Sequence, residues 1–176
     1  GDDVRSPQIG AGGNEVGSPT YEAAKFGNGI LSDVNDEGCY FPVASNSISV
    51  NKGTIEFWAK MKFDSSESSN HYFFSFRGPS TYYGIKMQYV LTGGRIDVDV
   101  MHHLTTQASV SVTGLSWNAG DLIHFGVVWD REGNDIGGGK TLVLYKDGVE
   151  IGSDTTTWAA SSDDQANNLY IGIAPD

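Results

Sequence analysis

The stretch from Asp121 to Gly152 constrains the fold more than any other part of the chain. It holds a dense apolar and aromatic run from Leu122 to Trp129, a polar glycine-rich loop, and a second apolar run from Thr141 to Tyr145. Asp147 and Gly148 follow that run, and both residue types tolerate the positive φ angles of a two-residue hairpin turn. The pattern predicts three consecutive antiparallel strands.

The first of these strands is apolar on both faces. Leu122 and Val128 would lie on one face, and the other face would carry Ile123, Phe125, Val127 and Trp129. Strands of this kind are typical of the buried centre of a layered structure. We therefore expect this strand to be sandwiched between layers that other segments supply.

The rest of the chain repeats a short-strand pattern. Its 176 residues include 23 glycines and five prolines, and no segment keeps a helical period; only Tyr21 to Phe26 could form a helical turn. Roughly ten short strands at intervals of about ten residues are typical of all-β proteins. We predict an all-β fold, a two-sheet antiparallel β-sandwich.

The chain is long enough for one domain that buries about 70% of its unfolded surface. Residues 1–20 are rich in Gly, Pro, Ser and Asp, which predicts a linker or an extended N-terminal arm, either disordered or docked on the domain. The domain itself would span residues 21–176.

The segment from Thr54 to Phe63 alternates cleanly. Its apolar residues Ile55, Phe57, Ala59 and Met61 face one way, whereas Trp58 lies among lysines and a glutamate on the other side. The pattern predicts a strand with one core face. Trp58 is then either sandwiched by neighbours or offered to a ligand.

A hairpin is predicted around Thr92-Gly93-Gly94, between the strands Tyr83–Leu91 and Arg95–Leu104. Alternation places Ile85, Met87, Tyr89, Ile96, Val98 and Val100 on a shared core face. The opposite face would carry Lys86, Gln88, Asp97, Asp99, Met101 and His103. This polar face is a candidate binding surface.

Charge excludes some ligand classes. Eleven Lys and Arg against 22 Asp and Glu give a formal charge of −11 and a pI near 4.6, which repels nucleic acid and anionic membranes. No apolar run is long enough to span a bilayer and no secretory leader is recognisable. We expect no nucleic-acid partner and no membrane insertion.

Cys39 is the only cysteine, so an intrachain disulfide is impossible. A lone cysteine of this kind most often behaves as a small buried apolar residue. We expect the same here.

Several segments resemble a known family in order and spacing. KFGNGILSDVNDEGCYFPV is similar to an opening strand with an acidic turn, TIEFWAKMKF to a central strand, and HFGVVWD, LVLYKDGVEIG and LYIG to closing hairpins. Together they resemble the concanavalin A-like jelly roll, in its laminin-G-like branch, over roughly Lys25 to Gly172. The resemblance implies a two-sheet jelly roll. It leaves function open, because this fold serves lectins, glycan-binding modules, glycosidases, lyases and adhesion domains.

The chain departs from that family at both ends. Members usually have an aromatic-containing strand ahead of the Lys-Phe-Gly segment and a Gly-x-Ile-Asp strand after the Tyr-Ile-Gly, and neither is recognisable here. We expect the N-terminal arm, a neighbouring domain or another protomer to supply these edge strands. Otherwise a sheet edge stays open, which favours association.

Asp97 and Asp99 are the most notable carboxylates. Two residues apart on one strand, they would project from the same face about 6 to 7 Å apart, within the range of glycosidase pairs. Family glycosidases carry a Glu-x-Asp-x-(x)-Glu run that is absent here. Two readings therefore compete with catalysis: the pair binds sugar hydroxyls together with Lys86, Gln88 and His103, or it belongs to a solvated sheet face.

Four aromatic residues fall in or beside loops: Trp158, Trp117, Tyr82 and Tyr83. An aromatic ring can cover the apolar face of a sugar while nearby carboxylates and amides bond its hydroxyls. Loop aromatics also serve as lids on the core. Trp158, in a polar stretch, is the preferred stacking platform.

Hard oxygen ligands cluster in one turn, at Asp33, Asn35, Asp36 and Glu37. The resemblance implies a structural Ca²⁺ near such a turn, and an unliganded acidic turn is the alternative. A second acidic loop, Asp130 to Asp135, has ligand types but lacks the glycine and closing glutamate of an EF-hand.

These observations favour a non-catalytic carbohydrate-binding module of a larger secreted or surface protein, with a glycan or polysaccharide as partner. The first alternative is a structural or adhesive module of a virion or cell-surface appendage, which could exchange strands with its partners. The second is a polysaccharide hydrolase or lyase on the same fold. No enzymatic nucleophile can be placed, so we expect no enzyme.

Overall fold

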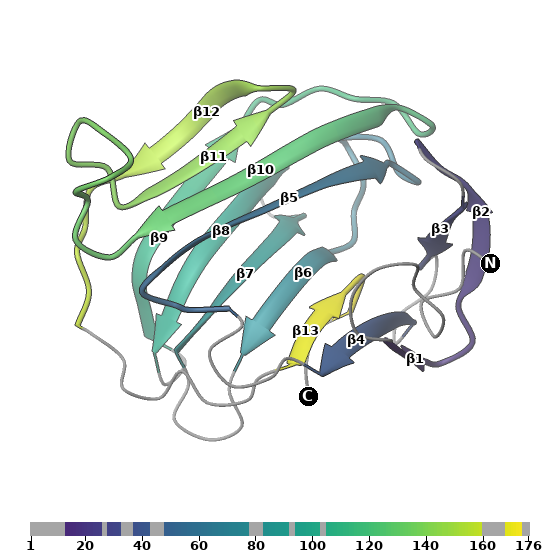
Figure 1. Cartoon of the computed structure of the whole chain (residues 1–176). Helices are drawn as coiled ribbons and strands as arrows, with labels where there is room; N and C mark the ends of the chain where they lie inside the picture. Colours follow the sequence, from purple (N-terminus) through teal and green to yellow (C-terminus); the bar gives the residue numbers. More distant parts are fainter. Residues whose placement is uncertain are drawn as a thin grey trace.

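The computed structural model describes residues 13–25, 28–32, 37–42, 48–77, 83–91, 94–102, 105–159 and 168–173. Within these ranges every regular element is a strand (Figure 1). The strands are β1 (Asn14–Val16), β2 (Thr20–Ala23), β3 (Asn28–Leu31), β4 (Gly38–Pro42), β5 (Lys52–Lys60), β6 (His71–Arg77), β7 (Tyr83–Val90), β8 (Arg95–His102), β9 (Thr105–Thr113), β10 (Leu122–Asp130), β11 (Leu142–Lys146), β12 (Val149–Asp154) and β13 (Asn168–Ile171). The predicted all-β class is confirmed. No helix of the described residues is long and apolar enough to cross a membrane.

The strands form two main antiparallel sheets that face each other (Figure 1). The larger sheet has seven strands in the order β1-β4-β13-β6-β7-β8-β9, and the smaller has four in the order β12-β11-β10-β5. The strands β2 and β3 pair as a separate hairpin. The predicted two-sheet sandwich is confirmed.

The stretch from β10 to β12 folds as predicted. β10 pairs with β11 on one side and β5 on the other, and β11 pairs with β12. Asp147 and Gly148 form the connecting turn with φ of 51° and 79°, the left-handed region that such a hairpin requires.

The expectation that both faces of β10 are covered is wrong. Ile123, Phe125, Val127 and Trp129 are buried in the core, but on the opposite face Leu122 is exposed and Val128 is half-buried. β10 is therefore central within its sheet but not between two layers. Only one face of this sheet meets the other sheet.

The core lies between the sheets. The six residues predicted to share a core face on β7 and β8 are all 0 to 1% exposed. Cys39 is also buried, and burial together with the nearby carboxylate of Glu15 raises its pKa to about 11. Its predicted role as a small buried residue is confirmed.

The N-terminal segment contributes strands instead of a helical turn. β1 pairs with β4 at the edge of the seven-stranded sheet, so the described part of the predicted arm is docked. Tyr21 to Phe26 was the one segment that could have formed a helical turn, and its first three residues belong instead to β2, Thr20–Ala23. The hairpin β2–β3 attaches through its polar groups: Tyr21 donates to Glu15, and Glu22 pairs with Lys60 and Lys62.

Candidate functional site

The outward face of the seven-stranded sheet carries a continuous row of aligned residues. Strand registers place one residue of each strand in this row, and these are Asn14, Tyr40, Tyr170, Ser75, Lys86, Asp99 and Ser109. A second, shorter row beside it contains Tyr72, Gln88, Asp97 and Ser111. We call these two rows the outward rows. They gather Lys86, Gln88, Asp97 and Asp99 on one face, as predicted.

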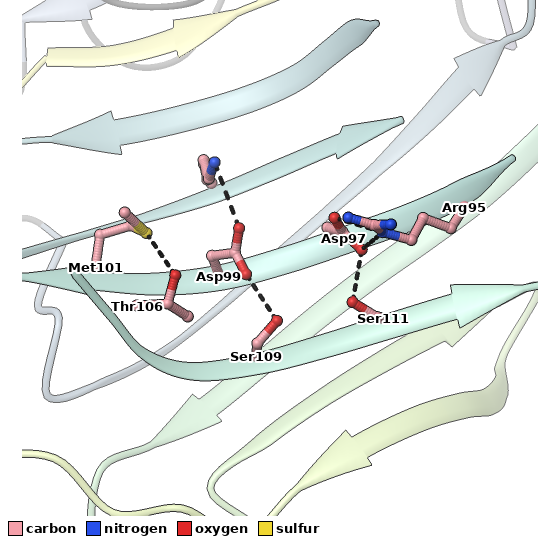
Figure 2. A network of polar contacts seen from close by, with 8 residues as sticks. Arg95, Asp97, Asp99, Met101, Thr106, Ser109 and Ser111 are labelled. Carbon is pink, nitrogen blue, oxygen red and sulfur yellow. Dashed lines mark hydrogen bonds and ion pairs between the residues drawn. The ribbon is translucent and has the colours of Figure 1, made fainter. Parts of the chain in front are cut away.

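The carboxylate of Asp97 accepts hydrogen bonds from two neighbouring side chains. The Arg95 Nε donates to both of its carboxylate oxygens, at 2.8 and 2.9 Å, and the Ser111 hydroxyl donates to Oδ1 at 2.6 Å (Figure 2). Arg95 lies on the same strand, two residues before Asp97, so both side chains point to the same face. The pair is therefore held together by strand geometry.

Asp99 repeats this arrangement one pleat further along β8. Ser109 on β9 donates its hydroxyl to Oδ1 at 2.7 Å (Figure 2). The ammonium of Lys86 on β7 lies 3.4 Å from Oδ2. Each aspartate thus has one cation and one serine hydroxyl as partners. The two carboxylates bridge β7, β8 and β9.

Both aspartates are nearly buried although they face away from the core. Asp97 is 5% and Asp99 8% exposed, and Ser75 between the tyrosines and Lys86 is also buried. Ion pairs with low exposure are less screened by solvent than pairs in open water. The arrangement is therefore preorganised, which distinguishes it from a freely solvated sheet face.

Two tyrosines extend the first row beyond Lys86. The rings of Tyr40 and Tyr170 lie side by side with centroids 5.8 Å apart and planes tilted by 38°. Both are half-buried, and the Asn168 amide donates to the Tyr170 hydroxyl at 3.2 Å. Partly exposed tyrosines combine an apolar ring with a polar tip, which suits sugar surfaces.

Tyr40 and Tyr170 were not among the predicted site residues. Their neighbours Cys39, Phe41, Leu169 and Ile171 are apolar, so alternation by itself would have placed both rings on an outward face. The pairing of β4 with β13, two strands from opposite ends of the chain, was the information that alternation lacked.

The two tryptophans predicted as stacking platforms are buried. Trp117 is 4% and Trp158 5% exposed, and both belong to the core cluster. Trp117 donates its indole N–H to the Phe63 carbonyl at 2.9 Å and packs edge-on against Phe63 and Tyr89. The expectation of exposed rings at these positions is wrong, because each ring covers the core from a loop.

Trp58 is the tryptophan that stays accessible, at 42% exposure, on the outer face of the four-stranded sheet. The Lys25 ammonium lies 4.6 Å from its ring centre, and the His124 ring lies 5.0 Å away. A cation over an indole ring is a favourable contact. Trp58 therefore contacts Lys25 and His124 of its own chain and stays partly exposed.

Other predicted site residues fall outside the described residues. These are Tyr82, His103, Asp33, Asn35 and Asp36, together with the side chain of Tyr83. Glu37 is described, and its backbone carbonyl accepts a hydrogen bond from the Ser32 hydroxyl at 2.5 Å. The described residues contain no group of three or more metal-ligating side chains.

The second acidic loop uses its carboxylates to cap its own backbone. Asp130 accepts hydrogen bonds from the backbone N–H groups of Glu132 and Asp135, at 3.1 and 2.8 Å. Asp135 in turn pairs with Lys52 on β5. These contacts account for the buried position of Asp130 without a ligand.

Two solved structures with a similar fold are an arabinanase domain and a neurotoxin binding domain. Domain 4 of AbnA, an extracellular arabinanase of family GH43 from Geobacillus stearothermophilus solved in complex with arabinotriose, matches with a TM-score of 0.68 and 16% identity, over 97% of this chain and 78% of that one. The binding domain of botulinum neurotoxin serotype G matches with a TM-score of 0.58 and 13% identity, over 95% of this chain and 43% of that one. At these identities the likeness concerns the fold alone.

No curated protein matches the sequence significantly. A laminin G model described as the concanavalin A-like lectin/glucanases superfamily matches residues 35–176. The match covers both main sheets apart from β1, and the antiparallel sandwich agrees with it. The chain therefore belongs to the concanavalin A-like lectin/glucanases superfamily.

Proposed function

We propose that this domain is a non-catalytic carbohydrate-binding module of a larger secreted or surface protein, and that it binds glycan on the outward rows of the seven-stranded sheet. The observation that carries the proposal is the shared face of the Tyr40–Tyr170 pair and the Lys86–Asp99 and Arg95–Asp97 pairs. Sugar rings need both an apolar platform and hydrogen-bonding groups. The arabinotriose complex of a domain with the same fold supports the same ligand class.

Binding without catalysis agrees with the partners of the two aspartates. Glycoside hydrolysis needs one carboxyl that gives a proton to the leaving oxygen and a second that attacks or activates water. Asp97 and Asp99 each bond a cation and a serine instead. We therefore expect no new reducing ends when the domain is incubated with the polysaccharide it retains, and their appearance would contradict the proposal.

The direct test is affinity electrophoresis on a panel of polysaccharide gels, followed by calorimetry with the polysaccharide that retains the domain. Losing a stacking surface of about 60 Å² at about 25 cal/mol per Å² costs about 1.5 kcal/mol, or about tenfold in Kd. Tyr170→Ala should therefore weaken binding about tenfold. Tyr145→Ala is the matched control, because Tyr145 is also half-buried but lies on the other sheet.

Equal Kd values for wild type and Tyr170→Ala would show that the glycan does not bind on the outward rows. Melting curves of both variants accompany the assay, so that a loss of folding is not mistaken for a loss of binding.

Calcium at the segment 33–37 belongs to the same proposal. The hard oxygen ligands of that segment suit Ca²⁺, and bound metal stabilises the folded state by an amount that grows with the logarithm of its concentration over Kd. Chelator should then lower the melting temperature of the domain. Identical melting curves with calcium and with chelator would refute the proposed calcium binding.

A structural or adhesive module is the second candidate, and β5 favours it. Among the described strands, β5 is an edge strand of the four-stranded sheet. Its inward residues Ile55, Phe57 and Ala59 are only half-buried. An open strand edge can accept a strand from a neighbouring domain or protomer. This role predicts concentration-dependent association in sedimentation and no retention on any polysaccharide of the panel.

A further inference from the structure

The hairpin β2–β3 stands apart from the core that the two main sheets enclose. None of its described residues is buried, and its apolar side chains Ile30 and Leu31 are half-buried without being among those that pack against the core. A two-stranded hairpin has little stability of its own in water. Contacts at its surface must therefore hold it in place.

One set of contacts joins the hairpin to the four-stranded sheet. The Glu22 carboxylate of β2 accepts a hydrogen bond from the Lys62 ammonium at 2.7 Å and lies 3.6 Å from the Lys60 ammonium. Lys25, which follows β2, places its ammonium 4.6 Å from the centre of the Trp58 ring on β5. Each of these contacts involves a charged group, and the side chains of the two ion pairs are 30 to 39% exposed.

A second set of contacts joins the hairpin to the seven-stranded sheet. Tyr21 of β2 donates its hydroxyl to Glu15 of β1 at 2.6 Å. The Ser32 hydroxyl, directly after β3, donates to the Glu37 carbonyl at 2.5 Å and lies 3.1 Å from the Gly172 carbonyl. Glu37 precedes β4 and Gly172 follows β13. The hairpin thus bridges the two sheets at one side of the sandwich (Figure 1).

From these contacts we infer that the hairpin β2–β3 is a strap between the sheets whose attachment to β5 depends on charge, so that high ionic strength releases it while both sheets stay folded. Salt screens exposed ion pairs. The two sheets are held together by an apolar core instead, which salt does not weaken. The inference is independent of the proposed glycan binding.

The protonation state of Glu22 supports this dependence on charge. The hydrogen bond from Lys62, together with the charges of Lys60 and Lys62, holds the pKa of the Glu22 carboxyl below its ordinary value. Glu22 is therefore ionised at neutral pH. Its attachment to the two lysines is ionic under the conditions of the experiment below.

Both attachments of the strap adjoin a pair of half-buried aromatic residues. Phe57 directly precedes Trp58 on β5, and the carbonyl of Phe73 on β6 accepts the Gly172 N–H at 3.1 Å. The Phe57 and Phe73 rings lie 6.1 Å apart. Release of the strap would make this pair and the edge strand β5 more accessible to an incoming strand. The strap thus controls access to β5.

Hydrogen exchange followed by mass spectrometry on the intact domain tests the strap. The Debye length falls from about 30 Å at about 0.01 M salt to about 3 Å at about 1 M. Amides of β2 and β3 should exchange at least about threefold faster at the higher NaCl concentration, as expected for the loss of two exposed ion pairs. Amides of β7 and β8, in the centre of the larger sheet, should keep the same slow exchange.

Trp58 fluorescence gives a second readout. Trp58 is 42% exposed, whereas the other three tryptophans are at most 5% exposed, so the uncharged quencher acrylamide reaches chiefly Trp58. Loss of the Lys25 ammonium from the Trp58 ring should increase this quenching at high salt.

Three variants identify the contacts responsible. At low salt Glu22→Gln should show the hairpin exchange rates that wild type shows at high salt, and added salt should change them little. Glu150→Gln is the matched control, because it removes a comparably exposed ion pair with Lys140 from β12, and it should leave hairpin exchange unchanged. Ser32→Ala removes an uncharged attachment and should speed hairpin exchange by the same factor at both ionic strengths.

Equal hairpin exchange at both ionic strengths, or equal effects of Glu22→Gln and Glu150→Gln, would overturn the dependence on charge. Hairpin amides that open only together with those of β7 and β8 would overturn the separate release. These measurements use no glycan, so their outcome is decided separately from that of the proposed function.

Discussion

Asp154 joins the two sheets on the side where β12 approaches β9, and its replacement by asparagine should remove one charge-assisted hydrogen bond across the sandwich. Its Oδ2 accepts the backbone N–H of Ser109 on β9 at 2.9 Å. Its Oδ1 accepts the N–H groups of Thr155 and Thr156 and the Thr156 hydroxyl, at 2.7 to 2.9 Å. A single carboxylate therefore connects two sheets and the loop that follows β12.

The structure sets the magnitude. Asparagine has one acceptor oxygen, so in Asp154→Asn this oxygen can accept hydrogen bonds either from the loop residues Thr155 and Thr156 or from the Ser109 N–H. The amide N–H₂ group then faces the remaining donor and cannot accept from it. A hydrogen bond to a charged group contributes about 1.5–3 kcal/mol. At about 2–4 °C per kcal/mol for a domain of this size, the melting temperature should fall by about 3 to 12 °C.

The pH dependence gives a second readout. Burial by itself would raise the pKa of Asp154, but the hydrogen bonds from Ser109, Thr156 and Thr155 outweigh it and hold the pKa below its ordinary value. The stabilisation is therefore fully present above the unfolded pKa of about 4 and is lost as the pH falls through the lower folded pKa. Urea unfolding from pH 7 to pH 3 should show the wild type approaching Asp154→Asn in stability at the acidic end.

Asp147→Asn is the matched control, because it makes the same chemical change nearby. Asparagine tolerates the left-handed turn conformation and keeps an acceptor for the His124 N–H, so the free energy of unfolding should change by less than about 0.5 kcal/mol. Equal losses in the two variants would refute the cross-sheet role of Asp154. So would a melting temperature of Asp154→Asn within about 1 °C of wild type, because that change is smaller than the fall of about 3 °C or more expected above.

Three further predictions concern the core. Gly53→Ala should destabilise the fold by about 1–3 kcal/mol in urea unfolding, because a Cβ at this position would lie 2.4 Å from the Trp129 ring; unchanged stability would mean that the ring moves easily. Burial holds the pKa of His71 below its ordinary value, although the negative charge of Glu67 acts in the opposite direction. The free energy of unfolding should therefore fall as the pH drops below about 6.5. His71→Phe should remove this part of the pH dependence of stability. With its pKa raised to about 11, the Cys39 thiol should react with a disulfide reagent at pH 8 only as fast as the protein unfolds; rapid labelling of the native domain would contradict its buried position.

Local sequence patterns predicted the elements well because their causes are local. Alternation along β7 and β8 placed Lys86, Gln88, Asp97 and Asp99 on one face, and the strand registers confirm it. A side chain's face in a strand depends only on its position parity. The hairpin at Asp147-Gly148 was equally predictable, since the turn demands residues that accept a positive φ.

Loop aromatics were harder to place. Trp117 and Trp158 stand among polar neighbours, and nothing in those neighbours indicates that the loops fold back over the core. Whether a loop ring packs inward depends on the space left between sheets that the rest of the chain builds. That space is a property of the assembled sandwich.

The sequence by itself determined the all-β class, the order of most strands and the polar character of the sheet face, because hydrophobic period and turn chemistry act over a few residues. Only the tertiary structure decided which strands lie side by side, and with them the binding face. Tyr40 and Tyr170 meet because β4 pairs with β13, and Arg95, Lys86 and two serines surround Asp97 and Asp99 because three strands align in register. Such contacts arise from long-range pairing, whose partners are selected by burial of the whole core and not by any one segment.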